Sequence, residues 1–319
     1  MQASVEISQL GGNKVASPSL SALRFNSTLT SLNLENNRVG HDILPLSAAL
    51  ALNSSLTCLN LDNNGLGATG VQILVEGFAS NSTSLICLEV MTQLAPEEAK
   101  LIVEAMPVTI TTLNLSHNNL KAEGAALVSQ LLKNNRFLTT LLFTGNDLRD
   151  AGAAHIAELL VTNSVLTYLG LSGNMIEAEG AGQIAEALKR NCTLTSLDLQ
   201  YNSLGDEGVA QISQALSVNS SLTELVIRYN KVTAAGAGHL AQALLTNSTL
   251  STLHLDNNQL EAEGAISIAQ AMASNSFSRV LASPLGPQVP SRIPSVVRLV
   301  FVNCTDLKLK SVWLWRIWI

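Results

Sequence analysis

The chain has 319 residues and a formal net charge of −6, and only 13% of its residues are charged. It has no basic run to grip phosphates, which argues against nucleic-acid binding. Four cysteines are too few for a disulfide scaffold, and the first ten residues, MQASVEISQL, lack the basic start and apolar core of a secretory signal, so we expect a cytoplasmic protein.

Residues 1–25 look like a shortened copy of a motif that recurs downstream. Val5 and Leu10 fall at strand positions and Asn13 at a turn position, but the run to the next copy is too short for a full unit. Because the open end of a stack of repeats exposes apolar core, we predict a degenerate capping repeat over 1–25.

Nine copies of the motif L-x-x-L-x-L-x-x-N fill residues 26–276. From Ile110 onward the first apolar residue recurs every 28 residues, as the positions 110, 138, 166, 194, 222 and 250 show. The motif begins at Leu29, Leu56, Leu85, Ile110, Leu138, Leu166, Leu194, Leu222 and Leu250. A fixed period of this length predicts stacked units that contact only their neighbours and form a long surface rather than a pocket.

Each unit is expected to contain one strand and one helix. In the repeat from Leu194, Leu197 and Leu199 alternate as in a strand, and Asn202 can satisfy backbone groups where the strand bends. Gly208 then opens an Ala-rich stretch in which Ile212 and Leu216 lie four residues apart, on one face of a helix. Because helices are wider than strands, the stack should curve into an α/β horseshoe solenoid, with parallel strands on its concave face and helices on its convex face.

A second asparagine ends each helix, three residues before the next motif. Asn163, Asn191, Asn219 and Asn247 hold this position. Since asparagine tolerates the left-handed conformation that terminates helices, we expect that conformation here.

The repeat that begins at Leu85 is irregular. It has 25 residues to Ile110, carries Pro96 and Pro107, and places Gln93 where the other eight repeats have asparagine. We therefore expect a local kink in the horseshoe over 91–109.

The motif fails after Asn275. Ser278 stands where an apolar residue is expected, and residues 277–319 hold half of the prolines and all three tryptophans. This segment is predicted to be an atypical tail that does not continue the stack as a regular repeat. Two interpretations stay open: a segment that contacts a partner or a membrane, or a sequence without selected structure.

The stretches NSTLTSLNLENN, at 26–37, and AEGAGQIAEAL, at 178–188, closely resemble the ribonuclease-inhibitor-like class of leucine-rich repeats. The resemblance covers roughly 26–276 and specifies the fold more than the function, because many unrelated interaction proteins share it. Similar repeats occur in NOD-like receptors and in effectors that intracellular bacteria send into host cells.

The concave face carries the candidate site. Its solvent-facing residues occupy the third, fifth, seventh and eighth motif positions, and tyrosine and arginine are frequent interface hot spots. We predict partner contacts at Asp198, Tyr201, Glu224, Arg228, Tyr229, His254 and Asp256. Tyr201 and Tyr229 should lie side by side, and Glu224 and Asp198 should hold Arg228 outward. Truncating Arg228 or Tyr229 should lower affinity with little loss of stability.

Two weaker features lie near the N-terminus. Glu35, Asp62 and Glu89 form a secondary acidic strip of solvent-facing positions. Cys58 and Cys87 share the third motif position and should be neighbours on adjacent strands, as two reduced thiols, since the strand spacing exceeds that of a disulfide.

Catalytic, metal-binding and phosphate-binding motifs are absent from the sequence, so we expect no enzyme activity, no cofactor and no small-molecule substrate. We expect a protein partner, with membrane contact disfavoured, and a cytoplasmic location that would be the host cytosol for an exported effector. The resemblance leaves two alternatives open: a small-GTPase regulator of the Ran GTPase-activating type, and an enzyme inhibitor of the ribonuclease-inhibitor type. The inhibitor family is richer in cysteine and acid than this chain.

Overall fold

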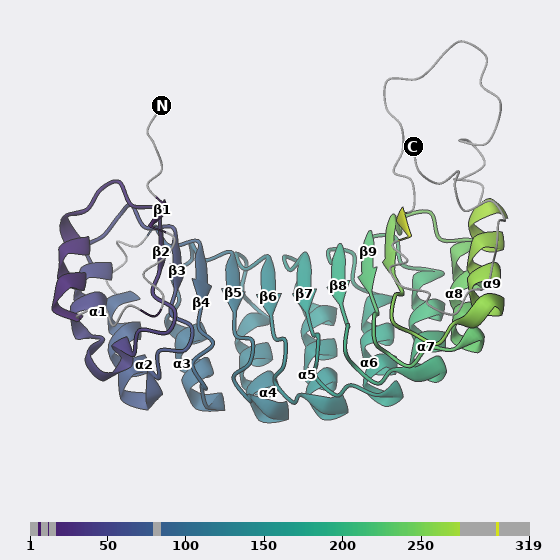
Figure 1. Cartoon of the computed structure of the whole chain (residues 1–319), viewed down its shortest axis with the longest axis horizontal. Helices are drawn as coiled ribbons and strands as arrows, with labels where there is room; N and C mark the ends of the chain where they lie inside the picture. Colours follow the sequence, from purple (N-terminus) through teal and green to yellow (C-terminus); the bar gives the residue numbers. More distant parts are fainter. Residues whose placement is uncertain (1–5, 8–11, 13–16, 79–83, 275–297, 300–319) are drawn as a thin grey trace, which may run out of the picture.

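The structure, a computed structural model, describes residues 6–7, 12, 17–78, 84–274 and 298–299. These residues form one arc, in which strands line the concave side and helices cover the convex side (Figure 1). The predicted horseshoe with parallel strands is confirmed.

The sheet contains eleven strands in the described residues, all parallel and in chain order. The strands are β1 (Glu6–Ile7), β2 (Ser31–Asn33), β3 (Cys58–Asn60), β4 (Cys87–Glu89), β5 (Thr112–Asn114), β6 (Thr140–Leu142), β7 (Tyr168–Gly170), β8 (Ser196–Asp198), β9 (Glu224–Val226), β10 (Thr252–His254) and β11 (Arg298–Leu299). In β2 to β10 the central residue of each strand is a buried leucine, and these leucines pair in register from Leu32 to Leu253.

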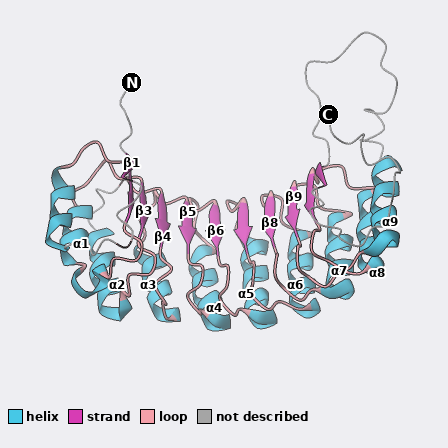
Figure 2. Cartoon of the chain, in the orientation of Figure 1, coloured by secondary structure: helices cyan, strands magenta, loops and turns pink. Residues whose placement is uncertain are grey.

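The helices form the second layer (Figure 2). The 3-10 helices are η1 (Ser17–Phe25) and η2 (Val39–Asp42), and the α-helices are α1 (Leu44–Leu50), α2 (Gly67–Phe78), α3 (Pro96–Ala105), α4 (Lys121–Leu132), α5 (Arg149–Thr162), α6 (Ala178–Leu188), α7 (Gly205–Leu216), α8 (Ala234–Leu244) and α9 (Glu261–Ser274). Ile212 and Leu216 are buried as predicted. A Cβ at Gly208 would lie 3.0 Å from the Cβ of Ala181, so glycine allows α7 to approach α6 closely.

An asparagine ladder links consecutive repeats. The side-chain amide of Asn174, which is fully buried, donates to the carbonyls of Phe143 (2.9 Å) and Leu171 (3.0 Å). Its Oδ1 accepts from the backbone amides of Asn146 (2.9 Å) and Leu148 (3.4 Å). Each ladder asparagine therefore satisfies backbone groups of its own repeat and of the preceding one, as the sequence predicted.

The second asparagine of each repeat works differently from the prediction. Asn163 has a φ of −81° and a ψ of 130°, so the expected left-handed conformation is wrong. Its Oδ1 accepts from the amides of Val165 and Leu166, both at 2.9 Å, and its side-chain amide donates to the carbonyl of Leu132 in the preceding repeat at 2.9 Å. This asparagine turns the chain into the next strand and forms a second ladder.

The irregular repeat keeps its strand register, since Leu88 of β4 pairs with Leu59 and with Leu113. Its turn is one residue short. The amide of Thr92 donates to Oδ1 of Asn118 at 2.9 Å, the contact that ladder asparagines make through their own backbone. Thr92, not Gln93, therefore occupies the position of the ladder asparagines, so the assignment of Gln93 to this position was wrong. Its buried hydroxyl has no hydrogen-bond partner. A change of curvature over 91–109 stays a prediction.

Strands occur beyond both ends of the regular array. β1 pairs with β2 through Glu6 and Ser31, and β11 pairs with β10 through Arg298 and Thr252. The interval from 252 to 298 exceeds one repeat, so β11 is not reached by the regular period, and the sequence did not predict it. Most of the predicted tail at 277–319 lies outside the described residues, and the capping role of 1–25 stays a prediction.

Candidate interaction surface

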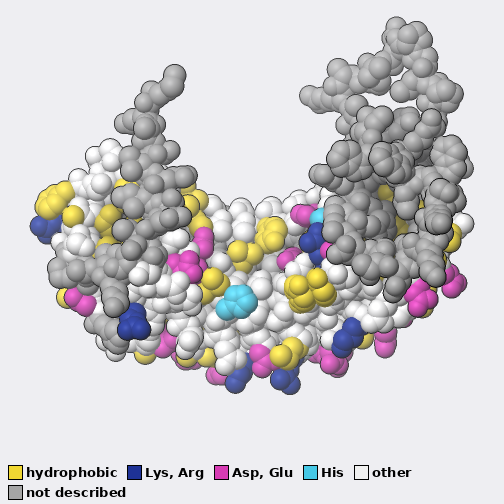
Figure 3. All heavy atoms as spheres, in the orientation of Figure 1, with side chains coloured by type: hydrophobic (Ala, Val, Ile, Leu, Met, Phe, Trp, Pro, Cys, Tyr) yellow, Lys and Arg dark blue, Asp and Glu magenta, His cyan; other side chains and the backbone are white. Residues whose placement is uncertain are grey.

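The predicted contact residues come together on three adjacent strands. The register of β8, β9 and β10 aligns Ser196 with Glu224 and Thr252, and Asp198 with Val226 and His254. The turns that follow these strands carry Tyr201, Arg228, Tyr229 and Asp256. Figure 3 shows that charged side chains gather mainly along the helical edge of the molecule, while the middle of the visible face is largely uncharged.

Tyr201 and Tyr229 form a stacked pair. Their ring centroids are 4.2 Å apart and the ring planes differ by 15°, which confirms the predicted side-by-side arrangement. The side chains are 52% and 41% exposed. Both residues hold the left-handed backbone conformation, with φ near 53° and 52°, which is uncommon outside glycine and asparagine. The neighbouring Tyr201 hydroxyl raises the pKa of Tyr229. The pair presents a rigid aromatic surface to solvent.

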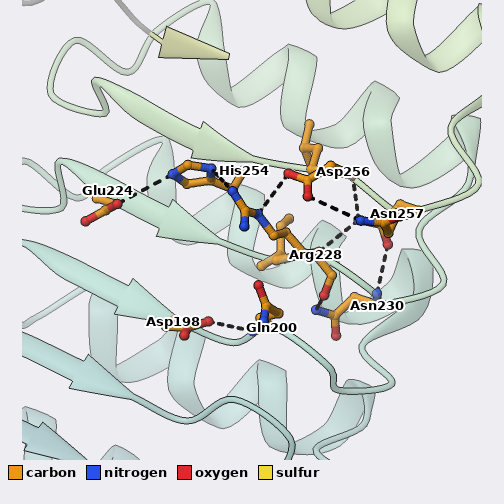
Figure 4. Close-up of polar contacts among 11 residues, drawn as sticks. Asp198, Gln200, Glu224, Arg228, Asn230, His254, Asp256 and Asn257 are labelled. Carbon is orange, nitrogen blue, oxygen red and sulfur yellow. Dashed lines mark hydrogen bonds and ion pairs between the residues drawn. The ribbon is translucent and has the colours of Figure 1, made fainter. Parts of the chain in front are cut away.

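Arg228 does not point outward as predicted. Its Nε lies 2.8 Å from Oδ1 of Asp256, and its terminal NH2 nitrogen lies 2.8 Å from Nδ1 of His254 (Figure 4). The Asp256 side chain is only 6% exposed and that of Arg228 is 30% exposed. The predicted bracing by Glu224 and Asp198 is therefore wrong, and Asp256 is a buried counter-ion rather than an exposed contact.

His254 links this ion pair to Glu224. Because a guanidinium can only donate, Nδ1 of His254 must accept, which places the proton of the neutral ring on Nε2. Nε2 lies 3.6 Å from Oε1 of Glu224, and Oε2 of Glu224 accepts from the Ser196 hydroxyl at 2.8 Å. A continuous polar network therefore crosses β8, β9 and β10.

Asp198 stands apart from the network. Its Oδ1 accepts from the backbone amide of Gln200 at 2.8 Å. Burial raises the pKa of Asp198, although the Gln200 amide and the charge of Arg228 act in the opposite direction.

The secondary acidic strip is only partly as predicted. Asp62 is 2% exposed, so its assignment as a solvent-facing acid is wrong. Its Oδ1 accepts from the backbone amide of Met91 at 2.7 Å, which supports the shortened turn. Glu35 and Glu89 stay half-buried on the concave face. Burial raises the pKa of Glu89, and the charges of Asp62 and Glu35 raise it further.

Cys58 and Cys87 pair in register on β3 and β4 and are not joined in a disulfide. Burial, with the neighbouring Cys58, raises the pKa of Cys87 to about 12, so this thiol stays protonated at neutral pH. Within the described residues, no group of three or more His, Cys, Asp and Glu side chains could hold a metal ion. In the same part of the chain, no helix is long and apolar enough to span a bilayer.

The sequence analysis did not identify a row of residues that forms the rim of the concave face, just after the strands end. The eighth motif position reads His117, Gly145, Gly173, Tyr201 and Tyr229 over five successive repeats, and all five hold the left-handed conformation. Backbone hydrogen bonds join neighbours along this row, from the Gly145 amide to Ser172 and from the Gly173 amide to Gln200, both at 2.8 Å. Reading this single position across the repeats would have revealed the row.

The "Leucine Rich repeat" family model matches eight segments that together cover more than half of the chain: 25–44, 52–75, 108–129, 134–157, 162–185, 190–213, 218–241 and 246–269. The chain belongs to the leucine-rich repeat family. The match passes over most of the irregular leucine-rich repeat around β4. As a leucine-rich repeat protein, it is built on an interaction scaffold that suits protein partners.

Solved structures share this fold. The leucine-rich repeat-containing protein LegL7 from Legionella pneumophila has 22% sequence identity and a TM-score of 0.58, over 81% of this chain and 84% of that one. Actin-binding site 2 of leiomodin-1 has 24% identity and a TM-score of 0.42, over 48% of this chain and 90% of that one. No curated protein matches the sequence.

Proposed function

We propose that the protein is a non-catalytic recognition module that binds a protein partner on its concave face. The observation that carries this proposal is the exposed Tyr201–Tyr229 stack beside the Arg228, His254 and Glu224 network. Rigid aromatic groups next to fixed polar groups suit a protein surface, because they lose little conformational entropy on binding.

The role we favour is that of an effector or an innate-immunity-type recognition protein acting in the cytosol. The family assignment supports protein binding, and the fold similarity to LegL7 fits a bacterial leucine-rich repeat protein. Cys58 and Cys87, which are neighbours on β3 and β4 and are not joined in a disulfide, fit a reducing compartment.

Capture of a partner by the immobilised full chain, followed by calorimetry, tests this proposal. Tyr229→Ala should weaken binding about thirtyfold, the typical effect of truncating an anchor residue. Val161→Ala, at a 46% exposed position of α5, is the matched control on the helical face and should leave affinity unchanged. The reverse pattern would move the site to the convex face. A GTPase stimulation assay on the captured protein tests the small-GTPase alternative.

A further inference from the structure

The rim of the concave face has a gap one residue wide. At Gly145, a Cβ would meet the ring of His117, with Cε1 at 2.7 Å, so this ring occupies the space that a side chain at 145 would need. At Gly173, the atoms of the described residues that come within 4 Å of a Cβ, chain neighbours aside, are backbone atoms of Gly145, at 3.8 Å. The described part of the chain therefore places no side chain in the space next to Gly173 that the ring of His117 occupies next to Gly145.

Aromatic rings border this gap on both sides. Tyr201 follows Gly173 in the next repeat, and its ring stacks on Tyr229, which lies one repeat further from the gap. Because Tyr229 covers one face of the Tyr201 ring, only the other face is available to a further planar group. His117 borders the gap from the other direction, through its position over Gly145. Because the tyrosine rings are 4.2 Å apart, one planar group above Gly173 would extend the same stack.

The charge of the concave face indicates which kind of planar group would bind next to Gly173. Over the third, fifth, seventh and eighth motif positions that the structure describes, Arg228 is the one Lys or Arg, and Asp256 already pairs with it. Glu35, Glu89, Asp198 and Glu224 leave the face acidic. A guanidinium is planar, stacks on aromatic faces and carries the complementary charge, whereas an ammonium group lacks the flat surface.

We propose that the gap above Gly173, between His117 and Tyr201, receives an arginine side chain from a basic segment of the protein partner. The guanidinium lies on the exposed face of Tyr201, and the acidic concave face holds the flanking positive charges. This inference rests on the proposed function and specifies the partner chemistry of the same face.

Three peptides of nearly equal charge separate the stacking contribution from general attraction: hexalysine, and hexalysine with its third residue replaced by arginine or by tryptophan. Calorimetry at low salt on the full chain should show the arginine peptide binding about fivefold more tightly than hexalysine, the effect of one cation–π contact. An equal affinity for these two peptides would overturn the proposal. Tighter binding of the tryptophan peptide would also overturn it, because the gap would then select an aromatic group.

Variants of the chain test the location. Tyr201→Ala should abolish the preference for arginine, and Tyr201→Phe should keep it because the ring remains. Gly173→Val should also abolish the preference by filling the gap. Gly205→Val is the matched control, since Gly205 has a φ of +59° against +64° at Gly173 and has open space around its Cβ position. A preference that survives Tyr201→Ala, or one that is lost in Gly205→Val, would refute the assignment.

Failure of this inference differs from failure of the proposed function. If the full chain captures a partner in a Tyr229-dependent manner but shows no arginine preference, only the arginine site is wrong. If Tyr229→Ala leaves partner affinity unchanged, the concave site itself is wrong.

Discussion

Arg228 and Asp256 form an ion pair after β9 and β10, with 2.8 Å between Nε and Oδ1, and neither of these two buried atoms makes a hydrogen bond within the described residues. The aspartate is buried and the guanidinium partly exposed, so removal of the arginine leaves a buried charge without its counter-ion, although Oδ2 of Asp256 still accepts from the Asn257 side chain at 3.3 Å.

Arg228→Ala should therefore lower the free energy of unfolding by about 2 kcal/mol, less than for a fully buried pair because the arginine is partly solvated. This outcome revises the expectation from sequence that the substitution leaves stability nearly unchanged. Urea denaturation of Arg228→Ala, of Asp256→Ala and of the double variant measures the coupling energy between the two side chains. If the two single effects simply add, the pair makes no net contribution.

The ladder position allows a matched comparison between two repeats. Asn174→Ala removes the side chain that bonds five buried backbone groups, those of Phe143, Asn146, Leu148, Leu171 and Ser172, and should cost about 3 kcal/mol or more. Thr92→Ala, at the same position of the short repeat, should cost less than about 1 kcal/mol, since the Thr92 hydroxyl has no partner to lose. Chemical denaturation of both variants gives the comparison, and equal costs would show that the ladder bonds contribute little.

The period of the sequence was enough to predict the solenoid, because backbone geometry follows directly from where apolar residues recur. Side-chain pairing was not predictable in the same way. Arg228 pairs with the buried Asp256, whereas Glu224 accepts from Ser196 and lies near His254, and the motif pattern alone does not show which acid becomes buried. Gln93 was assigned to the ladder position in place of Thr92 because a one-residue deletion in a turn leaves the flanking leucine pattern intact and so cannot be seen in the sequence. The Tyr201–Tyr229 pair was predictable since both residues share one motif position on adjacent repeats.

Asp206 caps the start of α8 in the next repeat, and we expect this contact to make the stability of the protein depend on pH in the acid range. Oδ1 of Asp206 accepts from the backbone amides of Thr233 (2.8 Å) and Gly236 (3.0 Å), and Oδ2 accepts from the Thr233 hydroxyl (2.6 Å). Burial raises the pKa of Asp206, but these hydrogen bonds outweigh it and leave the pKa below its ordinary value.

Because the folded-state pKa of Asp206 is depressed, its stabilisation is fully present above the unfolded-state pKa of about 3.9 and is lost as pH falls through the folded-state value. Asp206→Asn should lower the free energy of unfolding by about 1 kcal/mol at pH 7, and this difference should shrink toward zero under strongly acidic conditions. Denaturation midpoints measured from pH 2 to pH 7 test this, and a difference that does not vary with pH would contradict it.

Glu89 should show the opposite pH dependence. Burial raises its pKa, and the charges of Asp62 and Glu35 add to the shift, so the folded state favours the neutral carboxyl. The contribution of Glu89 to the free energy of unfolding is fully present below its unfolded-state pKa of about 4.3 and is lost as pH rises through its folded-state pKa. Glu89→Gln keeps an oxygen that can accept the hydrogen bond from the Asn60 side chain, which Oε2 of Glu89 accepts at 3.0 Å, and it removes the charge.

The Glu89→Gln variant should therefore be more stable than the parent by about 0.5 kcal/mol at pH 7, the size of one relieved like-charge contact on a sheet, and equally stable at pH 3. Paired urea titrations at the two pH values measure the difference. Glu158→Gln, at an exposed helical position whose carboxylate faces Lys133 at 3.2 Å, is the control and should not gain stability at pH 7. A Glu89→Gln variant that is less stable than the parent at pH 7 would mean that the carboxylate is held by favourable contacts, against the direction of its pKa shift.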